Sequence, residues 1–346
     1  MRVLIPDAQY PGLPDIEAEA LPGAEFMVHR ARDPLQIPDS VWARADGVLL
    51  WQDMPIDRAI ADKLARARIV VRHGVGFDRV DLAACAERGI VVCNTPDYGT
   101  EEVANHALAF ALALRRGLAT YGEMLSLDPQ AGWRWDAPPL MRRLSGQIFG
   151  IVGLGRIGRA CAARAAAFGF DVVYVDPLLR ADAAAKLPYR RFETLFDMLA
   201  EADIVSIHCP LTSDTHGLFG QGAFARMKKG AILINTARGP IVDTAALLAA
   251  IEAGQVGGAG LDVLPHEPPD PDDPLVAAYR LPPSWLAGRL LLSPHAAFYS
   301  PESWRDLRFK AAATLGAYLK ENRLRNCVNG HLFAQGALPT EEKTDI

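Results

Sequence analysis

Short apolar runs alternate with segments of helical periodicity along the first hundred residues. The apolar runs predict five strands, at Val3–Ile5, Phe26–Val28, Val48–Trp51, Ile69–Arg72 and Val91–Cys93. The segments between them predict helices, at Asp15–Ala20, Ser40–Ala45, Asp57–Ala67 and Val80–Arg88. Because the strands are apolar throughout rather than alternating, we expect a parallel sheet with both faces covered.

The same alternation returns after residue 146. Strands are predicted at Ile148–Val152, Val172–Val175, Ile204–Ile207, Ile232–Ile234, Gly258–Leu261 and Leu290–Leu292, and helices at Ile157–Phe168, Glu193–Ala200, Thr244–Ala253 and Pro301–Glu321. An apolar helix from Glu101 to about Leu125 and an aperiodic stretch, Asp128–Gly146, join the two series. A helix this apolar must pack on most sides, against its own domain or a second subunit. The last ten residues are polar, and we expect them to fray.

Composition narrows the class of protein. At about 150 residues per domain, 346 residues predict two domains. A net charge of −5, from 36 basic and 41 acidic residues, argues against a dedicated nucleic-acid binder. The sequence contains neither an apolar run long enough for a membrane span nor a signal peptide, so we expect a cytoplasmic protein. Five cysteines without a C-x-x-C pair favour reduced thiols, with no disulfide framework and no metal site.

A glycine-rich loop gives the clearest local signal. Gly153, Gly155 and Gly158 form G-x-G-x-x-G between a predicted strand and an alanine-rich helix, the context of dinucleotide binding. Asp176 ends the next strand at about the spacing of the carboxylate that binds a ribose hydroxyl. This carboxylate would repel a 2′-phosphate and so favours NAD over NADP, although Arg180 is close in sequence. The structural alternative is a glycine turn followed by an aspartate that only caps a helix.

Three chemically suggestive segments follow predicted strands: Asn235–Gly239, Leu261–Pro268 and Ser293–Ala297. Ligands of open α/β sheets bind beyond the carboxyl ends of the strands. Within these segments, His295 suits proton transfer near neutral pH, Glu267 would fix its tautomer, and Arg238 would hold a carboxylate. Taken singly, each has a structural explanation: a capping turn for the arginine, an acidic loop for the glutamate and a turn for the histidine.

Taken in order, the blocks of this sequence resemble the D-isomer-specific 2-hydroxyacid dehydrogenase family over about residues 45–325. The blocks are Gly74–Asp78 with Val80–Asp81, Asn94–Pro96, the glycine loop, His208–Thr212, Asn235–Gly239 with Val242–Asp243, Leu261–Val263 and Pro294–His295. The resemblance implies two doubly wound parallel-sheet α/β domains, one flavodoxin-like and one of the Rossmann type, with a cleft between them. It implies a discontinuous substrate domain (residues 1–99 and 297–332), a dinucleotide-binding domain (100–296) and a tail (333–346).

The resemblance also implies roles for individual residues. Arg238 would bind the substrate carboxylate together with the backbone N–H groups of Val75 and Gly76, and Glu267 and His295 would form the acid–base pair. The residues implied at the cofactor are Thr100, Gly153, Gly155, Arg156, Ile157, Gly158, Asp176, Cys209, Pro210, Thr236, Ala237 and Asp262. Of these, Thr100 and Arg156 would lie near the pyrophosphate, and Asp262 would orient the nicotinamide carboxamide. Family members are usually dimers, so a homodimer through residues 101–146 is expected.

Within the family, His295–Ser300, Arg72 and Ala167–Phe170 are most similar to the C-terminal-binding-protein branch of NADH-responsive corepressors. Arg72 is therefore a second candidate for the substrate carboxylate, the alternative being a strand-end arginine that faces solvent. Phe298 would shape the substrate pocket where that branch typically has tryptophan. An apparent insertion, Val276–Gly288, is expected to form either a lid or a surface loop.

These residues, together with the resemblance, predict an NAD-dependent oxidoreductase; the resemblance implies that it interconverts a small D-2-hydroxyacid and its 2-oxoacid, working as a 2-oxoacid reductase. Glu267 argues against the formate dehydrogenase branch, which has glutamine at this position. Two alternatives remain open. One is an NADH-sensing, corepressor-like dimer with vestigial activity. The other is a phosphoglycerate-type dehydrogenase, which would need further basic residues for a phosphate.

Overall fold

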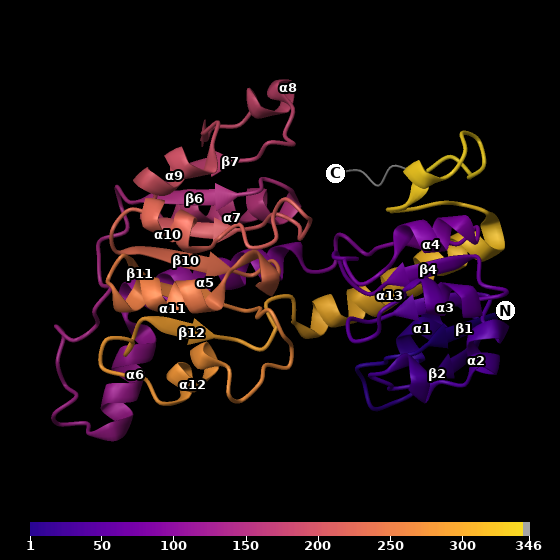
Figure 1. The fold of residues 1–346 in the computed structure, drawn as a ribbon, viewed down its shortest axis with the longest axis horizontal. Helices are drawn as coiled ribbons and strands as arrows, with labels where there is room; N and C mark the ends of the chain where they lie inside the picture. The colour runs from indigo at the N-terminus through magenta and orange to yellow at the C-terminus, as the bar shows by residue number, and fades with distance from the viewer. Residues whose placement is uncertain (342–346) are drawn as a thin grey trace. The chain divides into compact units, whose positions relative to one another are not determined.

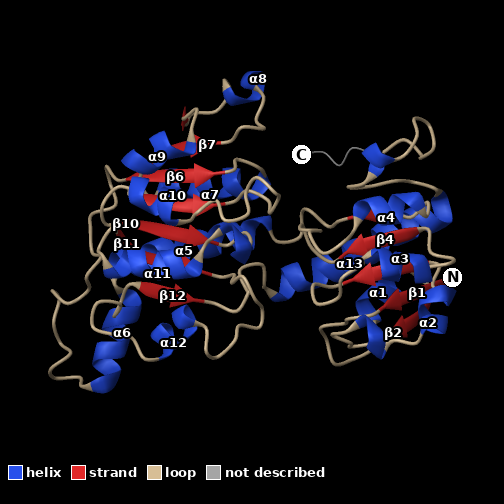
Figure 2. Ribbon diagram, in the orientation of Figure 1, coloured by secondary structure: helices blue, strands red, loops and turns tan. Residues whose placement is uncertain are grey.

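Two parallel sheets, each built from its own part of the chain, organise the structure (Figure 1). The computed structural model describes residues 1–341, which fall into two units. Unit 1 comprises Met1–Gly99 and the chain from Tyr299 onward, and unit 2 comprises Thr100–Phe298. The expected class, two parallel-sheet α/β domains, is confirmed, and helices flank the strands in both units (Figure 2). The assignment of unit 1 as a substrate domain stays a prediction.

Unit 1 contains a five-stranded sheet in the order β2-β1-β3-β4-β5, with every pairing parallel. Its strands are β1 (Arg2–Ile5), β2 (Glu25–Val28), β3 (Gly47–Leu50), β4 (Ile69–Arg72) and β5 (Val91–Cys93). Its helices are α1 (Asp15–Ala20), α2 (Asp39–Arg44), α3 (Arg58–Lys63), α4 (Leu82–Glu87) and α13 (Pro301–Glu321), with short 3-10 turns η1 (Pro34–Gln36) and η3 (Gly330–Leu332). This strand order is that of flavodoxin-like folds.

Both faces of the unit 1 sheet are covered, which explains why its strands lack alternation. One face packs against α2, α3 and α4 through buried side chains such as Trp42, Ile60 and Cys85. The opposite face is covered by α13, where Leu307 and Leu315 are buried. The gold helix α13 lies among the indigo and purple N-terminal elements in Figure 1. Helix α13, which comes late in the chain, thus covers the sheet face that α2, α3 and α4 do not cover.

Unit 2 contains a seven-stranded parallel sheet in the order β12-β11-β10-β9-β6-β7-β8. The strands are β6 (Ile148–Val152), β7 (Asp171–Val175), β8 (Arg190–Arg191), β9 (Ile204–Ile207), β10 (Ala231–Asn235), β11 (Val256–Leu261) and β12 (Leu290–Leu292). Strands β7 and β8 lie on one side of β6, and β9 to β12 lie on its other side, so the strand order reverses at β6. This switch point is where open α/β sheets bind ligands, and the glycine loop follows β6 there.

Helices cover the two faces of the unit 2 sheet. They are α5 (Thr100–Arg116), α6 (Leu118–Leu127), α7 (Arg156–Ala167), α8 (Ala181–Ala184), α9 (Leu195–Glu201), α10 (Gln221–Arg226), α11 (Thr244–Glu252) and α12 (Pro274–Arg280), with a 3-10 turn η2 (Gly239–Ile241). On β10, Ile232 and Ile234 belong to the apolar cluster under α5 and α7. Leu233 between them belongs to the cluster under α9, α10 and α11. Successive strand residues therefore serve opposite faces.

The helix predicted from Glu101 to about Leu125 is wrong as a single element. Gly117 adopts a left-handed backbone, with φ of 64°, and separates α5 from α6. A side chain at this position would also overlap with Pro138. Gly117 therefore allows both the change of direction and the close approach of the following segment.

Two further expectations can be compared with the structure. In the apparent insertion Val276–Gly288, the chain completes α12, and Leu286 is buried in the unit 2 core. The expectation of fraying in the last ten residues is wrong at Glu341, which bridges to Leu324 and accepts a hydrogen bond from the Cys327 N–H group at 2.8 Å. Of the ten residues, 342–346 lie outside the described part of the chain.

Three global features bear on the class of protein. In the described part of the chain, none of the helices has the length and apolar character that a membrane span requires. Among residues 1–341, no three histidine, cysteine, aspartate or glutamate side chains cluster so as to hold a metal ion. The five cysteines are all free thiols.

Candidate active site

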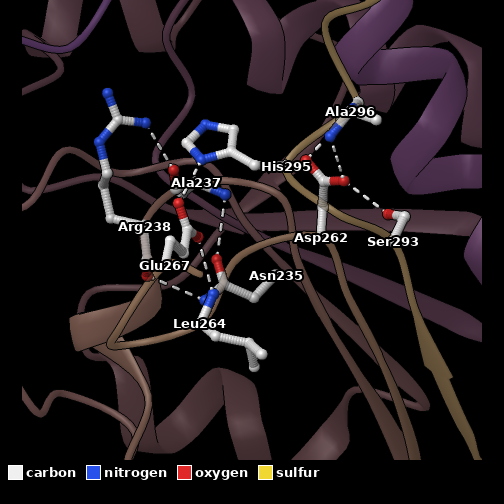
Figure 3. Close-up of polar contacts among 10 residues, drawn as sticks. Asn235, Ala237, Arg238, Asp262, Leu264, Glu267, Ser293, His295 and Ala296 are labelled. Atoms are coloured by element: carbon white, nitrogen blue, oxygen red, sulfur yellow. Dashed lines mark hydrogen bonds and ion pairs between the residues drawn. The ribbon is translucent and has the colours of Figure 1, made fainter. Parts of the chain in front are cut away.

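The candidate acid–base residues lie on loops that follow three adjacent strands. In the sheet, Asn235 at the end of β10 pairs with Leu261 of β11, and Leu261 pairs with Leu292 of β12. Arg238, Glu267 and His295 each follow one of these strands within a few residues. Because parallel strands end at the same edge, the three loops meet, and Figure 3 shows the three side chains gathered there.

His295 and Glu267 are in direct contact. The Nδ1 atom of His295 lies 2.6 Å from Oε2 of Glu267, and Oε1 of Glu267 accepts a hydrogen bond from the Leu264 N–H group at 2.9 Å. Burial raises the pKa of Glu267, but the hydrogen bond and charge of His295, the Leu264 N–H group and the charge of Arg238 together lower it below its usual value. An ionised carboxylate only accepts hydrogen bonds, so Nδ1 carries a proton and Nε2 is left for a substrate.

Arg238 is held in place by the turn after β10. The Asn235 side chain is fully buried, accepts a hydrogen bond from the Ala237 N–H group at 3.0 Å and donates one to the Arg238 carbonyl at 2.9 Å. A side chain at Gly239 would overlap with the backbone of Leu264, so only glycine lets this turn touch the loop that carries Glu267. Asn235 and Gly239 lie in a segment that the sequence marks as chemically suggestive, but no individual role is predicted for either, although a buried asparagine at a strand end is a detectable signal.

The turn that carries His295 is fastened to Asp262. His295 has a positive φ of 53°, and its N–H group donates to the Asp262 carbonyl at 2.7 Å. The Asp262 carboxylate accepts hydrogen bonds from the N–H groups of Ala296 at 2.8 Å and Ala297 at 3.0 Å, and from the Ser293 hydroxyl at 2.5 Å (Figure 3). Asp262 therefore fixes the histidine turn, and its role at the nicotinamide stays a prediction.

The glycine loop has the shape that a dinucleotide pyrophosphate requires. Gly153 has a positive φ of 90°, and a side chain there would approach the Cys209 nitrogen to 2.8 Å. A side chain at Gly158 would overlap with the Gly153 carbonyl, so this glycine permits close packing of α7 on β6. Within residues 1–341, by contrast, no atom beyond its chain neighbours lies within 4 Å of a side chain placed at Gly155, and no side chain caps the N-terminus of α7. The helix N–H groups are thus available to a phosphate.

Asp176 ends β7 beside the glycine loop. One carboxylate oxygen accepts a hydrogen bond from the Leu154 N–H group at 2.7 Å, and the other accepts from the N–H groups of Leu178 at 2.9 Å and Leu179 at 3.1 Å. The carboxylate is therefore held at a fixed point next to the loop. Arg180 pairs with Asp182 at 3.1 Å on the exposed surface.

The remaining predicted cofactor residues lie in unit 2 as well. Thr100 opens α5, Arg156 and Ile157 open α7, Cys209 and Pro210 follow β9, and Thr236 and Ala237 follow β10. The Thr236 hydroxyl is buried and has no hydrogen-bond partner among the described residues. A buried polar atom without a partner is costly, so a ligand or water that bonds to it would be favoured. Together with the open glycine loop, these residues fit a dinucleotide.

Three of the predicted substrate residues lie at the carboxyl end of the unit 1 sheet. Arg72 ends β4 and folds over Gly74, where a side chain would approach its Nη1 atom to 2.7 Å. Val75 and Gly76 follow in the loop, and the Val75 carbonyl accepts a hydrogen bond from the Asn94 side chain at 2.7 Å. The fourth, Phe298, lies in unit 2 with its ring centre 6.5 Å from that of His295. The substrate-binding roles of all four stay predictions.

Comparisons with known proteins identify the family of this chain. Residues 108–297 match the family described as D-isomer specific 2-hydroxyacid dehydrogenase, NAD binding domain. The chain is 34% identical to a glyoxylate reductase of Korarchaeum cryptofilum over 314 residues, which are 90% of this chain and 87% of the relative. The chain is also similar to the structure of a D-lactate dehydrogenase from Aquifex aeolicus complexed with NAD and lactic acid (28% identity, TM-score 0.79, 92% of this chain and 96% of that one).

A further structural relative is an NADPH-dependent glyoxylate/hydroxypyruvate reductase from Sinorhizobium meliloti in complex with NADP and malonate. The identity is 28% and the TM-score 0.82, with 99% of both chains covered. The relatives thus include proteins solved with either cofactor, and they do not distinguish the corepressor-like branch from the others.

Proposed function

The chain belongs to the D-isomer specific 2-hydroxyacid dehydrogenase family, and on this premise we propose that it reduces a small 2-oxoacid to the D-2-hydroxyacid with NADH. Glyoxylate is our first candidate substrate, because the curated relative with 34% identity is a glyoxylate reductase. The observation that carries the proposal is the 2.6 Å contact between His295 and Glu267, with Arg238 on the adjoining turn.

The proposed reaction needs a proton donor and a carboxylate anchor. His295 would give the proton on its Nε2 atom to the substrate oxygen, while Glu267 at Nδ1 stabilises the protonated ring. Arg238 would bind the substrate carboxylate with its guanidinium group and stabilise negative charge that develops on the oxygen. NADH, when bound, supplies the hydride. We further propose that Arg72 and the N–H groups of Val75 and Gly76 bind the carboxylate, and that Phe298 shapes the pocket.

We propose that the glycine loop and Asp176 bind the cofactor and that NAD is preferred to NADP. Asp176 would accept hydrogen bonds from the ribose hydroxyls, and its charge would repel a 2′-phosphate. The other cofactor residues of the proposal are those that line the ends of β9, β10 and β11 and the first turns of α5 and α7. Arg180 could attract the 2′-phosphate of NADP, but it already pairs with Asp182, so we expect it to weaken the preference for NAD only slightly.

We also propose that the protein is a homodimer through residues 101–146. In support, Leu118, Leu127, Trp133 and Trp135 are strongly exposed on or after α6, at 63, 79, 81 and 85%. Side chains this large and apolar are costly to leave in water, and clusters of them mark interaction surfaces. Light scattering of the wild type and of the Trp133→Ser, Trp135→Ser double variant tests this: the variant should be monomeric. A wild type that is itself monomeric contradicts it.

The experiment that tests the proposed function follows NADH absorbance with a panel of 2-oxoacids. The panel contains glyoxylate, hydroxypyruvate, pyruvate, phenylpyruvate and 4-methylthio-2-oxobutyrate, together with 3-phosphohydroxypyruvate. Saturable turnover of a small member supports the proposal. Turnover restricted to a phosphorylated acid, 3-phosphohydroxypyruvate, would instead favour a phosphoglycerate-type dehydrogenase. If none of these acids is reduced, while NADH binds and drives dimerisation, the proposed dehydrogenase activity is contradicted and an NADH-sensing binding protein is favoured.

A further inference from the structure

A histidine on α5 reaches the turn that carries His295. The Nε2 atom of His106 lies 2.9 Å from the Ser293 hydroxyl, although 187 residues separate the two in sequence. The same hydroxyl lies 2.5 Å from Oδ1 of Asp262, and the His106 Nε2 atom lies 3.9 Å from that oxygen. Asp262 in turn fixes the turn of His295. His106 is therefore one end of a chain of contacts that leads to the proposed proton donor.

The chemistry of the groups sets the direction of the hydrogen bonds. The buried Asp262 carboxylate accepts only, so the single proton of the Ser293 hydroxyl points to it. The Ser293 oxygen must then accept from His106, so the Nε2 atom of His106 carries a proton. The result is an oriented series of two donors that ends on the carboxylate. Such series strengthen each bond beyond its isolated value.

The placement of His106 follows from the packing of α5 on β11. Phe110, one helical turn later, lies against Gly260, where a side chain would approach the Phe110 ring to 2.6 Å. The His106 ring meets the edge of the Phe110 ring at a centroid distance of 4.7 Å. Positions four residues apart share one face of a helix. The contact between Phe110 and Gly260 thus sets the register that brings His106 to the end of the strand, beside Asp262 and Ser293.

We propose that His106 is a positioning residue, which holds the Ser293 hydroxyl and the Asp262 carboxylate so that the turn of His295 keeps its left-handed backbone. This inference rests on the proposed function, since its kinetic effect is on the proposed proton transfer. His106 acts through Ser293 and Asp262 rather than by contact with the substrate. Its contribution is to the rate of the chemical step rather than to the binding of NADH or of the 2-oxoacid.

The test compares His106→Leu with His106→Gln, because the glutamine amide can donate a hydrogen bond from a similar position and leucine cannot. The loss of about one hydrogen bond predicts a roughly tenfold fall in kcat for His106→Leu, with unchanged KM for both substrates. His106→Gln should retain most of the wild-type kcat. His331→Leu, on an exposed residue of unit 1, is the matched control and should leave the kinetics unchanged.

A double-variant cycle shows whether His106 acts through Ser293. Ser293→Ala should lower kcat by itself, and adding His106→Leu should cause no further loss, because the path is already broken. Additive losses, equal impairment by leucine and glutamine, or a wild-type kcat in His106→Leu would each overturn the proposal. Ser293→Ala breaks the same path at its middle member, so the proposal stays testable if His106→Leu does not fold.

A measurement without turnover separates this inference from the proposed function. NMR of isotope-labelled histidine should show a proton on Nε2 of His106, and Ser293→Ala should shift that signal selectively. If the wild type reduces none of the 2-oxoacids but the NMR result holds, the proposed function has failed and the contact stands. If the ring is protonated on Nδ1 alone, the positioning role is wrong whatever the enzyme reduces.

Discussion

The Nδ1 atom of His295 lies 2.6 Å from Oε2 of Glu267, across 28 residues of chain. The contact is produced by two loops that leave neighbouring strands, β11 and β12, at the same edge of the unit 2 sheet. A second hydrogen bond holds each partner: Glu267 accepts one from the Leu264 N–H group, and the His295 N–H group donates one to the Asp262 carbonyl. An ionised carboxylate and a ring with one free nitrogen are what general acid catalysis by histidine requires.

Glu267→Gln should slow the reduction without weakening NADH binding. The glutamine keeps the size of the side chain, but protonated His295 loses a charged partner that is worth more than a neutral one. Hydrogen bonds to charged groups contribute about 1.5–3 kcal/mol, which predicts a fall in kcat of about ten- to a hundredfold. Steady-state kinetics with NADH titration checks this. An unchanged kcat would mean that the contact is structural only.

Asp7 should make the stability of unit 1 depend on pH. Burial raises the pKa of Asp7 to about 6, although its carboxylate accepts hydrogen bonds from the N–H groups of Trp51 and Met54. The folded chain thus holds this proton more tightly than the unfolded chain, so stability falls as the pH rises from about 4 to about 6. The free energy of unfolding should fall by about 3 kcal/mol across this interval. Asp7→Asn should show no such fall.

Urea unfolding of the wild type and Asp7→Asn at pH values across this interval measures the effect as a difference between the two proteins. The variant should gain stability relative to the wild type as the pH rises. A constant difference between the two would show that Asp7 has an ordinary pKa in the folded chain.

Asp176→Asn should change the cofactor preference. The substitution removes the charge that would repel a 2′-phosphate and keeps the shape of the side chain. We expect the KM for NADH to rise and that for NADPH to fall, which together shift the kcat/KM ratio by about tenfold or more. Asp171→Asn, on the exposed first residue of β7 at the opposite end of the strand from Asp176, is the control and should leave the ratio unchanged. An unaltered ratio in Asp176→Asn would reduce Asp176 to a turn residue that only bonds Leu178 and Leu179.

Two alanine substitutions in the glycine loop should have different effects. Gly158→Ala forces a side chain into the Gly153 carbonyl, so we expect a lower Tm as well as weak NADH binding. Gly155→Ala meets open space, so its Tm should match the wild type, while the added methyl group obstructs the pyrophosphate and weakens NADH binding about tenfold or more. Thermal unfolding and NADH fluorescence measure both. Normal NADH binding by Gly155→Ala would argue against a phosphate at this loop.

The sequence predicted those elements that local pattern determines. The runs such as Val48–Leu50 were recognisable as strands because they are apolar on both faces. The break at Gly117 was missed, because a single glycine in an apolar helical pattern does not reveal its left-handed backbone. Strand β8 was missed for a different reason: Arg190 and Arg191 form a short polar edge with no apolar run.

The same distinction holds for the site. Arg238, Glu267 and His295 follow predicted strands, and the topology of a parallel sheet brings such positions to one edge. No role is predicted from sequence for Ser293 or His106, because their roles depend on a contact between segments that are far apart in sequence. The register of α5 on β11 creates that contact, and local periodicity carries no information about it.

Comparing His295→Ala with the wild type in NADH-dependent reduction of glyoxylate shows whether His295 is the proton donor. We predict that the wild type turns over, and that the variant binds NADH with unchanged affinity while its kcat falls by about 10²–10⁴-fold, the usual contribution of a positioned general acid. A His295→Ala variant that reduces glyoxylate as fast as the wild type would contradict the role of His295 as proton donor, because the proton would then have to come from another group.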